Sequence, residues 1–371
     1  MINRQRMIDQ LLELVRIDSP SSKEGAVARR LEEILTDLGM TVVFDDAGKK
    51  LGTDTGNLIA TLKGTVPGTP ILFSAHMDTV QQPGESVNPV VDGDVIRSDG
   101  TTILGSDDKA GITAFIEAVR VLQENKIPHG DVQAVFTIWE EGGLFGSLNL
   151  DYSLVNAERA FILDSGGAVG TIINQGPAQD RIEAVFHGKA AHAGVEPEAG
   201  ISAIQMAARA IDTMNLLRID AETTANLGSI EGGRATNIVT PEVRLVGEAR
   251  SQKNEKLDAQ TAHMKAAMEQ AASDFGGAVD VTVERVYSAF HVSAEAPMIQ
   301  TLKEVFVTMG LEPVIQSSGG GSDTNHFNNN GISAVNLSVG MDKAHTNDEY
   351  IPIDDLVEAG QMVVEIIKAH A

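Results

Sequence analysis

The fold is decided by the stretch ILFSAHMD, residues 71–78. Its first three side chains are all apolar, so a strand built from them is buried on both faces rather than on one. Strands of this kind lie in sheets that helices cover on both sides. The stretch ends with a histidine and an aspartate, placed where the chain leaves the strand.

Further runs of the same kind extend this pattern along the chain. The strands that we expect are Thr41–Phe44, Asn57–Leu62, Ile71–Ala75, Val132–Trp139, Ala160–Leu163, Val314–Ser317 and Ser333–Ser338. Helical patterns cover Asn3–Ile17, Lys23–Leu38, Lys109–Glu124 and Ile353–Ala369. The alternation predicts an α/β fold with a helix-covered, mostly parallel sheet.

A different order of elements occupies the region between residues 179 and 287. Strands are expected at 181–187, 226–231, 242–250 and around 279–283, with helices at 199–217 and 255–275. The first of these helices is expected to carry Ile204, Ala208 and Ile211 on one face. The order β-α-β-β-α-β is the ferredoxin-like pattern. We therefore predict that 179–287 is a second domain, inserted into a first domain that comprises 1–178 and 288–371.

Composition narrows the classes of function. The 371 residues are enough for two domains of ~100–200 residues each. With 28 basic and 52 acidic residues the formal net charge is −24, which makes nucleic acid and anionic membranes poor partners. Cysteine is absent, which excludes disulfides, thiolate zinc sites and a cysteine nucleophile. Residues 1–18 are expected to form an amphipathic helix rather than a secretory signal, so we expect a cytoplasmic protein.

Histidine and acidic residues follow the ends of several expected strands. His76 and Asp78 follow the strand at 71–75, Asp107 and Asp108 open a helix, Glu140 and Glu141 follow the strand at 132–139, Asp164 follows the strand at 160–163, and His345 follows the strand at 333–338. In open α/β sheets, ligands bind beyond the carboxyl ends of the strands. Each fragment alone has an ordinary explanation, such as a helix cap or a solvated loop. Because five separate segments converge, a metal site is the better hypothesis.

The residue types fit a specific chemistry. Without cysteine, a zinc or cobalt site must use imidazole and carboxylate ligands. Two cations ~3.5–4 Å apart need a carboxylate between them, and such a pair lowers the pKa of a water. A carboxylate that stays free of metal must then accept the proton of that water. Of two adjacent glutamates, one can bind metal while the other reaches the water.

The motifs resemble those of the dinuclear zinc exopeptidases, the family that includes peptidase T, aminoacylase and the carboxypeptidase G type. They are SAHMDTV at 74–80, GSDDKAG at 105–111, EEG at 140–142, Asp164 and the segment of His345. They span nearly the whole chain. The resemblance implies a metal-dependent catalytic domain with an inserted lid or dimerisation domain. It also implies two divalent ions, with zinc foremost and cobalt or manganese as alternatives.

The resemblance assigns roles to individual residues. One metal would be held by His76, Asp107 and Asp164, and the other by Asp107, Glu141 and His345, so that Asp107 bridges the two. Glu140 matches the general base of the family, and Asp78 matches the carboxylate that orients His76. Asp108 and Lys109 are expected to be structural, the former as a helix cap and the latter on the helix surface.

The inserted domain carries further motifs of the family. His192, in GKAAHAG at 188–194, would stabilise an oxyanion, often in the neighbouring subunit of a dimer. Asn237 and Arg250 match positions that contact substrate, and Gly320 and Gly321 lie in a segment, SSGGGSD at 317–323, that resembles a glycine-rich substrate loop. We therefore expect a homodimer through the inserted domain.

Among the subfamilies, LGSDDKAGI at 104–112 looks most like peptidase T, the tripeptide aminopeptidase. Two positions depart from it: Ser318 stands where peptidase T has an arginine before the paired glycines, and GGLFG at 142–146 follows the glutamate pair. We expect a metal-dependent exopeptidase acting on short peptides, with tripeptides first. An N-acyl amino acid deacylase, a dipeptidase, a carboxypeptidase and a metal-dependent binding protein without activity are the alternatives.

Overall fold

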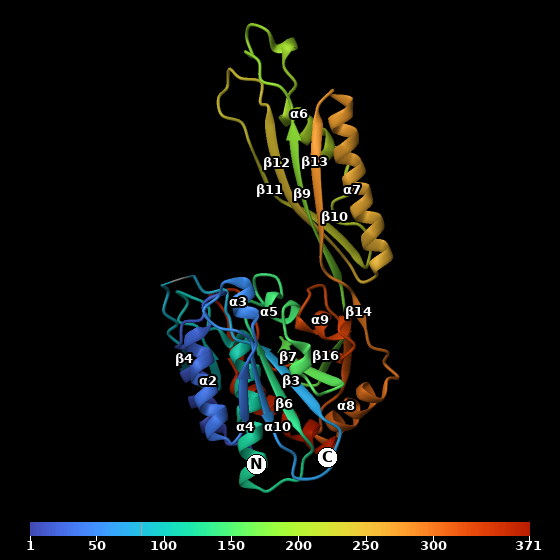
Figure 1. The fold of residues 1–371 in the computed structure, drawn as a ribbon. Helices are drawn as coiled ribbons and strands as arrows, with labels where there is room; N and C mark the ends of the chain where they lie inside the picture. The colour runs from blue at the N-terminus through green and yellow to red at the C-terminus, as the bar shows by residue number, and fades with distance from the viewer. Residues whose placement is uncertain (83) are drawn as a thin grey trace. The chain divides into compact units, whose positions relative to one another are not determined.

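The structure is a computed structural model that describes residues 1–82 and 84–371. It divides into two compact units. The first comprises Met1–Gln175, His291–Ser318 and Ser322–Ala371, and the second comprises Gly176–Phe290 with Gly319–Gly321. Both termini therefore belong to the first unit (Figure 1).

A nine-stranded sheet forms the centre of the first unit. Its order is β1-β2-β6-β3-β7-β16-β8-β14, and β15 also pairs with β8. The strands are β1 (Thr41–Phe44), β2 (Leu58–Leu62), β3 (Ile71–His76), β6 (Val132–Thr137), β7 (Arg159–Ser165), β8 (Thr171–Gly176), β14 (Phe290–His291), β15 (Val314–Ser317) and β16 (Ser333–Ser338). The four neighbours β6, β3, β7 and β16 are parallel, whereas β1, β2 and β8 join antiparallel. The predicted mostly parallel α/β sheet is confirmed.

Burial on both faces of β3 explains why this strand lies at the centre. All six of its residues are buried. Phe73 belongs to the larger hydrophobic cluster and packs against the rings of Phe115 and Phe161, with centroids 5.8 and 5.5 Å away. The adjacent Leu72 belongs to a different cluster, which also contains Phe327. Successive side chains point to opposite faces of a strand, so both faces are covered.

The helices of the first unit bury these two faces. They are α1 (Arg4–Val15), α2 (Gly25–Asp37), α3 (Ala47–Leu51), α4 (Ser106–Glu124), α5 (Phe145–Leu148), α8 (Pro297–Thr308), α9 (Asp323–Asn329) and α10 (Ile353–Ala369), with a 3₁₀ turn at Tyr152–Leu154. Helix α4 contacts β3 and β7 and packs against α1 and α10, while α9 contacts β7, β16 and α5. Figure 1 shows α4 and α10 beside the central strands.

Several short elements were not predicted from the sequence. A small separate sheet pairs β17 (Tyr350–Pro352), β5 (Val95–Arg97) and β4 (Val90–Asp92). Strand β8 and helices α8 and α9 were also missed. Three-residue strands contain too few positions for a periodic pattern, and α9, with the sequence DTNHFNN, is almost entirely polar.

The second unit is built on a five-stranded antiparallel sheet. Its order is β10-β11-β12-β9-β13. The strands are β9 (Ala178–His187), β10 (Leu217–Arg218), β11 (Thr223–Gly232), β12 (Glu242–Ser251) and β13 (Ala278–Tyr287), and the helices are α6 (Ala203–Thr213) and α7 (Asn254–Asp274), with a 3₁₀ turn at Pro197–Ala199. Apart from the short β10, this is the predicted ferredoxin-like order. Over the described residues, no helix of either unit is long and apolar enough to cross a membrane.

The face of α6 that carries Ile204, Ala208 and Ile211 is not its most buried face, although Ile211 is half-buried against the core of the unit. Ile204 is 48% exposed, and Ala208 is exposed as well. The buried positions are Ala203, Met206, Ala207 and Ala210, and Met214 continues the same stripe beyond the helix. The helix carries two apolar stripes, and the one with small residues packs on the sheet because it lets the backbone approach closely. Periodicity alone does not distinguish two such stripes.

Candidate metal centre

The predicted ligands come from one edge of the central sheet. His76 is the last residue of β3, and Asp164 is the last but one of β7. Glu141 follows β6 after three residues, and His345 lies beyond the end of β16. Because these four strands are parallel neighbours, their carboxyl ends lie at the same edge. The structure brings these side chains together there with that of Asp107, from the start of α4.

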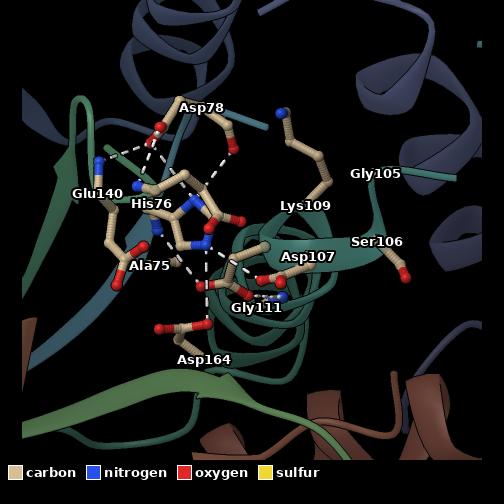
Figure 2. A network of polar contacts seen from close by, with 12 residues as sticks. Ala75, His76, Asp78, Gly105, Ser106, Asp107, Lys109, Gly111, Glu140 and Asp164 are labelled. Carbon is tan, nitrogen blue, oxygen red and sulfur yellow. Dashed lines mark hydrogen bonds and ion pairs between the residues drawn. The ribbon is translucent and has the colours of Figure 1, made fainter. Parts of the chain in front are cut away.

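One group of ligand atoms surrounds His76. Its Nε2 atom lies 3.1 Å from Oδ1 of Asp107 and 3.7 Å from Oδ1 of Asp164. In a tetrahedral site with bonds of about 2.0–2.1 Å, ligand atoms lie about 3.4 Å from one another. Both separations from His76 Nε2 are therefore close to those of ligands that share one ion. Figure 2 shows the three side chains converging.

A second group surrounds His345. Its Nε2 atom lies 3.2 Å from Oδ2 of Asp107 and 2.7 Å from Oε1 of Glu141. Asp107 therefore directs one carboxylate oxygen at each histidine, which is the geometry of a bridging ligand. Ligand atoms of His76, Asp107 and Glu141 also lie within 4.8 Å of one another.

Asp78 connects the His76 segment to the glutamate pair. His76 Nδ1 lies 3.0 Å from the carbonyl oxygen of Asp78 and 3.5 Å from its Oδ1. The buried carboxylate also accepts hydrogen bonds from the backbone N–H groups of Glu140, at 2.9 Å, and Glu141, at 3.2 Å. Ser21 Oγ donates a further bond at 2.6 Å. Burial raises the pKa of Asp78, but the hydrogen bond and charge of His76, together with the bonds from Ser21 and the Glu140 N–H, lower the pKa overall.

The electrostatics of this edge favour cations. Burial raises the pKa of Asp164 to about 7. Burial and the charge of Asp164 hold the pKa of Glu140 well above its usual range. Hydrogen bonds to Asp107 and Glu141 raise the pKa of His345 to about 10. Positive charge placed between such crowded carboxylates stabilises their ionised forms. A bound divalent ion therefore favours the ionised acids and the neutral imidazoles that act as metal ligands. The residues present therefore fit two metal ions.

Asp108 and Lys109 lie beside these ligands. Asp108 accepts hydrogen bonds from the N–H groups of His76, at 3.3 Å, and Gly111, at 3.2 Å. A carboxylate oxygen of Asp108 also lies within 4.8 Å of ligand atoms of His76 and Asp164. The prediction of a surface position for Lys109 was wrong, because the side chain is only 1% exposed. Its Nζ donates to Ser19 Oγ and the Met77 carbonyl, both at 2.8 Å, and burial lowers its pKa to about 8.

Three supporting residues were missed in the sequence. Asn336 on β16 pairs with the backbone of Asp164, accepting from its N–H at 3.0 Å and donating to its carbonyl at 2.8 Å. Glu24 is buried and accepts the N–H of Trp139 at 2.9 Å, directly before the glutamate pair. Glu349 is buried against the segment of Asp107. Nothing in the spacing of these residues signals burial, since polar residues are mostly exposed.

The other predicted site residues belong to the second unit. His192 is exposed, and its Nδ1 accepts the N–H of Gly194 at 3.2 Å. The segments of His192 and Asn237 are neighbours, because the N–H of Ala193 donates to the Asn237 carbonyl at 2.9 Å. Arg250 is held by Glu248 through two bonds of 2.8 and 3.0 Å.

The paired glycines of the predicted substrate loop also fall in this unit. Gly320 lies in the segment Gly319–Gly321, which groups with Gly176–Phe290. At Gly321, a Cβ atom would lie 2.2 Å from Cζ of Tyr287. Only glycine therefore fits at this position without displacing the ring.

Comparison with known proteins places the chain in a family. Residues 72–369 match the peptidase family M20/M25/M40. The chain belongs to this family. Its protein relatives include the uncharacterized protein YqjE of Bacillus subtilis, 47% identical over 371 residues with all of both chains covered. Peptidase T of an Exiguobacterium species is 26% identical over 416 residues, covering 99% of this chain and 98% of the relative.

Solved structures of M20/M25/M40 peptidases agree with this assignment. The aminopeptidase PepT of Bacillus cereus is 44% identical with a TM-score of 0.92, covering 99% of both chains. A tripeptidase of Staphylococcus aureus is 42% identical with a TM-score of 0.95, covering 99% of this chain and 98% of that one. A dinuclear metal-binding M20 peptidase of Bacillus subtilis shares the fold at 19% identity and a TM-score of 0.77, covering 98% of this chain and 97% of that one.

These comparisons confirm two predictions. The chain is a hydrolase that acts as a peptidase of the M20/M25/M40 family. The resemblance to peptidase T, inferred from the segment around Asp107, is also confirmed.

Proposed function

We propose that the chain is a dinuclear metal-dependent exopeptidase that releases the N-terminal residue of short peptides, with tripeptides as the first substrates to test. The observation that carries the proposal is the position of Asp107, whose two carboxylate oxygens face two separate histidines. The relatives described as an aminopeptidase and a tripeptidase support the substrate class.

The donor set decides which ions to expect. Two imidazoles and three carboxylates suit zinc, with cobalt and manganese as alternatives. Bound divalent ions would supply the positive charge that polarises the scissile carbonyl and lowers the pKa of the attacking water. His76, Asp107 and Asp164 would hold one ion, and Asp107, Glu141 and His345 the other.

Glu140 is the residue proposed to move the proton. Its backbone is fixed by the bond from its N–H to Asp78, and its carboxylate is buried next to the ligands. Glu140 would accept a proton from the attacking water and pass it to the nitrogen of the departing amine. Asp78 would hold the imidazole of His76 in the tautomer that leaves Nε2 free to bind metal.

The second unit is proposed to complete the substrate site. His192 would donate a hydrogen bond to the oxygen of the scissile carbonyl, and Asn237, Gly320 and Gly321 would contact the peptide backbone. The pairing of Arg250 with Glu248 favours an aminopeptidase over a carboxypeptidase, because a C-terminal carboxylate would have to displace a bidentate partner.

The inserted region 179–287 is proposed to act as a lid and as the contact of a homodimer. Ile204 and Ile230 support the second role, since they are 48% and 58% exposed on α6 and β11. A second copy of the chain that covered these side chains would remove their apolar surface from water. The cytoplasmic location expected from the sequence stays a prediction.

The experiment compares Glu140→Gln with the wild type on a tripeptide and on an N-acetyl amino acid, with added zinc or cobalt. We expect metal-dependent release of the N-terminal residue from the tripeptide, reduced ~10²–10⁴-fold in the variant. The metal content of the variant should equal that of the wild type, because Glu140 is not a proposed ligand. Activity restricted to the acetylated substrate, or hydrolysis that persists in excess chelator, would contradict the proposal.

A further inference from the structure

Glu349 is a buried carboxylate that makes four hydrogen bonds to one short segment. Its Oε2 accepts the N–H groups of Leu104, at 2.7 Å, and Gly105, at 2.9 Å. Its Oε1 accepts the hydroxyl of Ser106, at 2.6 Å, and the N–H of Asp107, at 3.2 Å. The residue is fully buried, at 0% exposure.

The segment that Glu349 holds is the one that delivers Asp107. Gly105 has φ +74°, in the left-handed region that favours glycine, and it precedes the first residue of α4. Consecutive N–H groups in such a turn form a concavity that binds an anion. Here the anion is the side chain of Glu349 rather than a ligand from solution. The N-terminus of α4 is therefore capped by a residue 242 positions away in the sequence.

Glu349 also belongs to the segment that delivers His345. The two residues are four positions apart, and the backbone N–H of Glu349 donates to the carbonyl of Thr346 at 3.1 Å. The N–H of Ser98 in turn donates to the Glu349 carbonyl at 3.0 Å. The His345 side chain is 51% exposed and has φ +64°, so packing alone does little to hold it in place. Its position depends on how this segment is anchored.

We propose that Glu349 is a positioning residue that fixes the distance between Asp107 and His345, and so sets the affinity for the second metal ion. The Glu349 carboxylate links the segment of Asp107 to the segment of His345, and the side chains of these two residues lie 3.2 Å apart. Charge-assisted hydrogen bonds from four donors resist any change in that separation. The inference rests on the proposed dinuclear site and concerns a residue that contacts neither metal nor substrate.

The test replaces Glu349 with glutamine and measures zinc binding in two steps by calorimetry on the metal-free full-length protein. Glutamine has the same shape, but its NH₂ group meets donors where the carboxylate had an acceptor. We expect the dissociation constant of the His345 site to rise about 10- to 100-fold, while that of the His76 site changes much less. In the cobalt-loaded protein, the absorption of the second ion should change in the same variant.

Glu117→Gln is the matched control. Glu117 is a buried carboxylate on the same helix, α4, and accepts bonds from the Asn3 N–H and from Arg6 at 2.6–2.9 Å. Its partners include none of the proposed metal ligands. The control should lower the stability of the metal-free protein and leave both zinc dissociation constants unchanged.

Ser106→Ala tests the same link if Glu349→Gln does not fold. It removes one of the four donors and should weaken the second zinc site about three- to tenfold. If Glu349→Gln, or this substitute, leaves both dissociation constants within about twofold of the wild type, Glu349 is only a structural residue and the inference is wrong. If the wild type itself binds fewer than two ions, the proposed dinuclear function fails instead, so the two failures are distinguishable.

Discussion

Replacing Asp78 with asparagine is expected to weaken metal binding as well as the fold. The Asp78 carboxylate accepts three hydrogen bonds, at Oδ1 from the Glu140 N–H and at Oδ2 from the Glu141 N–H and Ser21 Oγ. It also lies 3.5 Å from Nδ1 of His76. One side chain therefore contacts the segments of two proposed ligands and of the proposed base.

The size of the effect follows from these contacts. Asparagine has the same volume, but one acceptor oxygen becomes an NH₂ donor. In either orientation, this group faces the N–H of Glu140 or Glu141, and that N–H loses its buried acceptor. Such a donor costs about 1–3 kcal/mol, and because the loss is present with and without metal, it lowers the free energy of unfolding rather than the zinc affinity. Zinc affinity falls for a separate reason, since loss of a group that orients a metal ligand typically weakens metal binding about 10–100-fold.

The assay is competition for zinc with a chromophoric chelator, beside chemical unfolding of the metal-free protein. Asp180→Asn is the control, since Asp180 is a buried carboxylate of the second unit with partners in Thr261 and Arg285. It should reduce stability and leave zinc affinity unchanged. The reasoning is refuted if Asp78→Asn binds zinc within about twofold of the wild type, or if Asp180→Asn weakens zinc binding equally.

Three further measurements address stoichiometry, pH and assembly. Asp164→Ala should retain one zinc ion, whereas Asp107→Ala should lose both, because Asp107 directs one carboxylate oxygen at each histidine. Equal zinc content of the two variants by elemental analysis would contradict the bridge. Burial lowers the pKa of His326 from 6.5 to about 4, so unfolding takes up a proton between these values. The free energy of unfolding of the metal-free protein should therefore fall as the pH drops through this window, by up to about 3 kcal/mol from this residue. In His326→Gln this contribution to the pH dependence should vanish. If the free energy of unfolding of this variant, measured by denaturant titration, falls with pH as steeply as that of the wild type, the assignment to His326 is wrong. Ile204→Lys should change stability by less than about 0.5 kcal/mol, because the side chain is half exposed, and should turn a dimer into a monomer in light scattering. A dimer that persists would place the contact elsewhere.

Much of the site could be predicted because its residues are tied to strand ends. His76 and Asp164 occupy strand termini in the structure as they do in the sequence pattern, and parallel neighbours bring such termini together. Strand ends are marked locally, by a change from apolar to polar residues. The pattern therefore predicts which segments meet before any contact is known.

The supporting residues could not be found in this way. Lys109 looked like a surface lysine, and Glu349 carried no signal, yet both are buried among polar partners. Burying a charged group is unfavourable unless partners surround it, and those partners come from distant segments. For a related reason the sequence does not show which apolar stripe of α6 is buried, since either one satisfies the helical period.

The sequence by itself determined the α/β class, the inserted ferredoxin-like order and the set of histidine and acidic residues at one sheet edge, because these follow from local periodicity and from the ends of strands. Only the tertiary structure decided that Asp107 turns its two oxygens to different histidines, and that Asp78 and Glu349 hold the surrounding backbone. These features depend on distances between segments far apart in the chain. Such distances are set by packing of the whole unit, which no local pattern encodes.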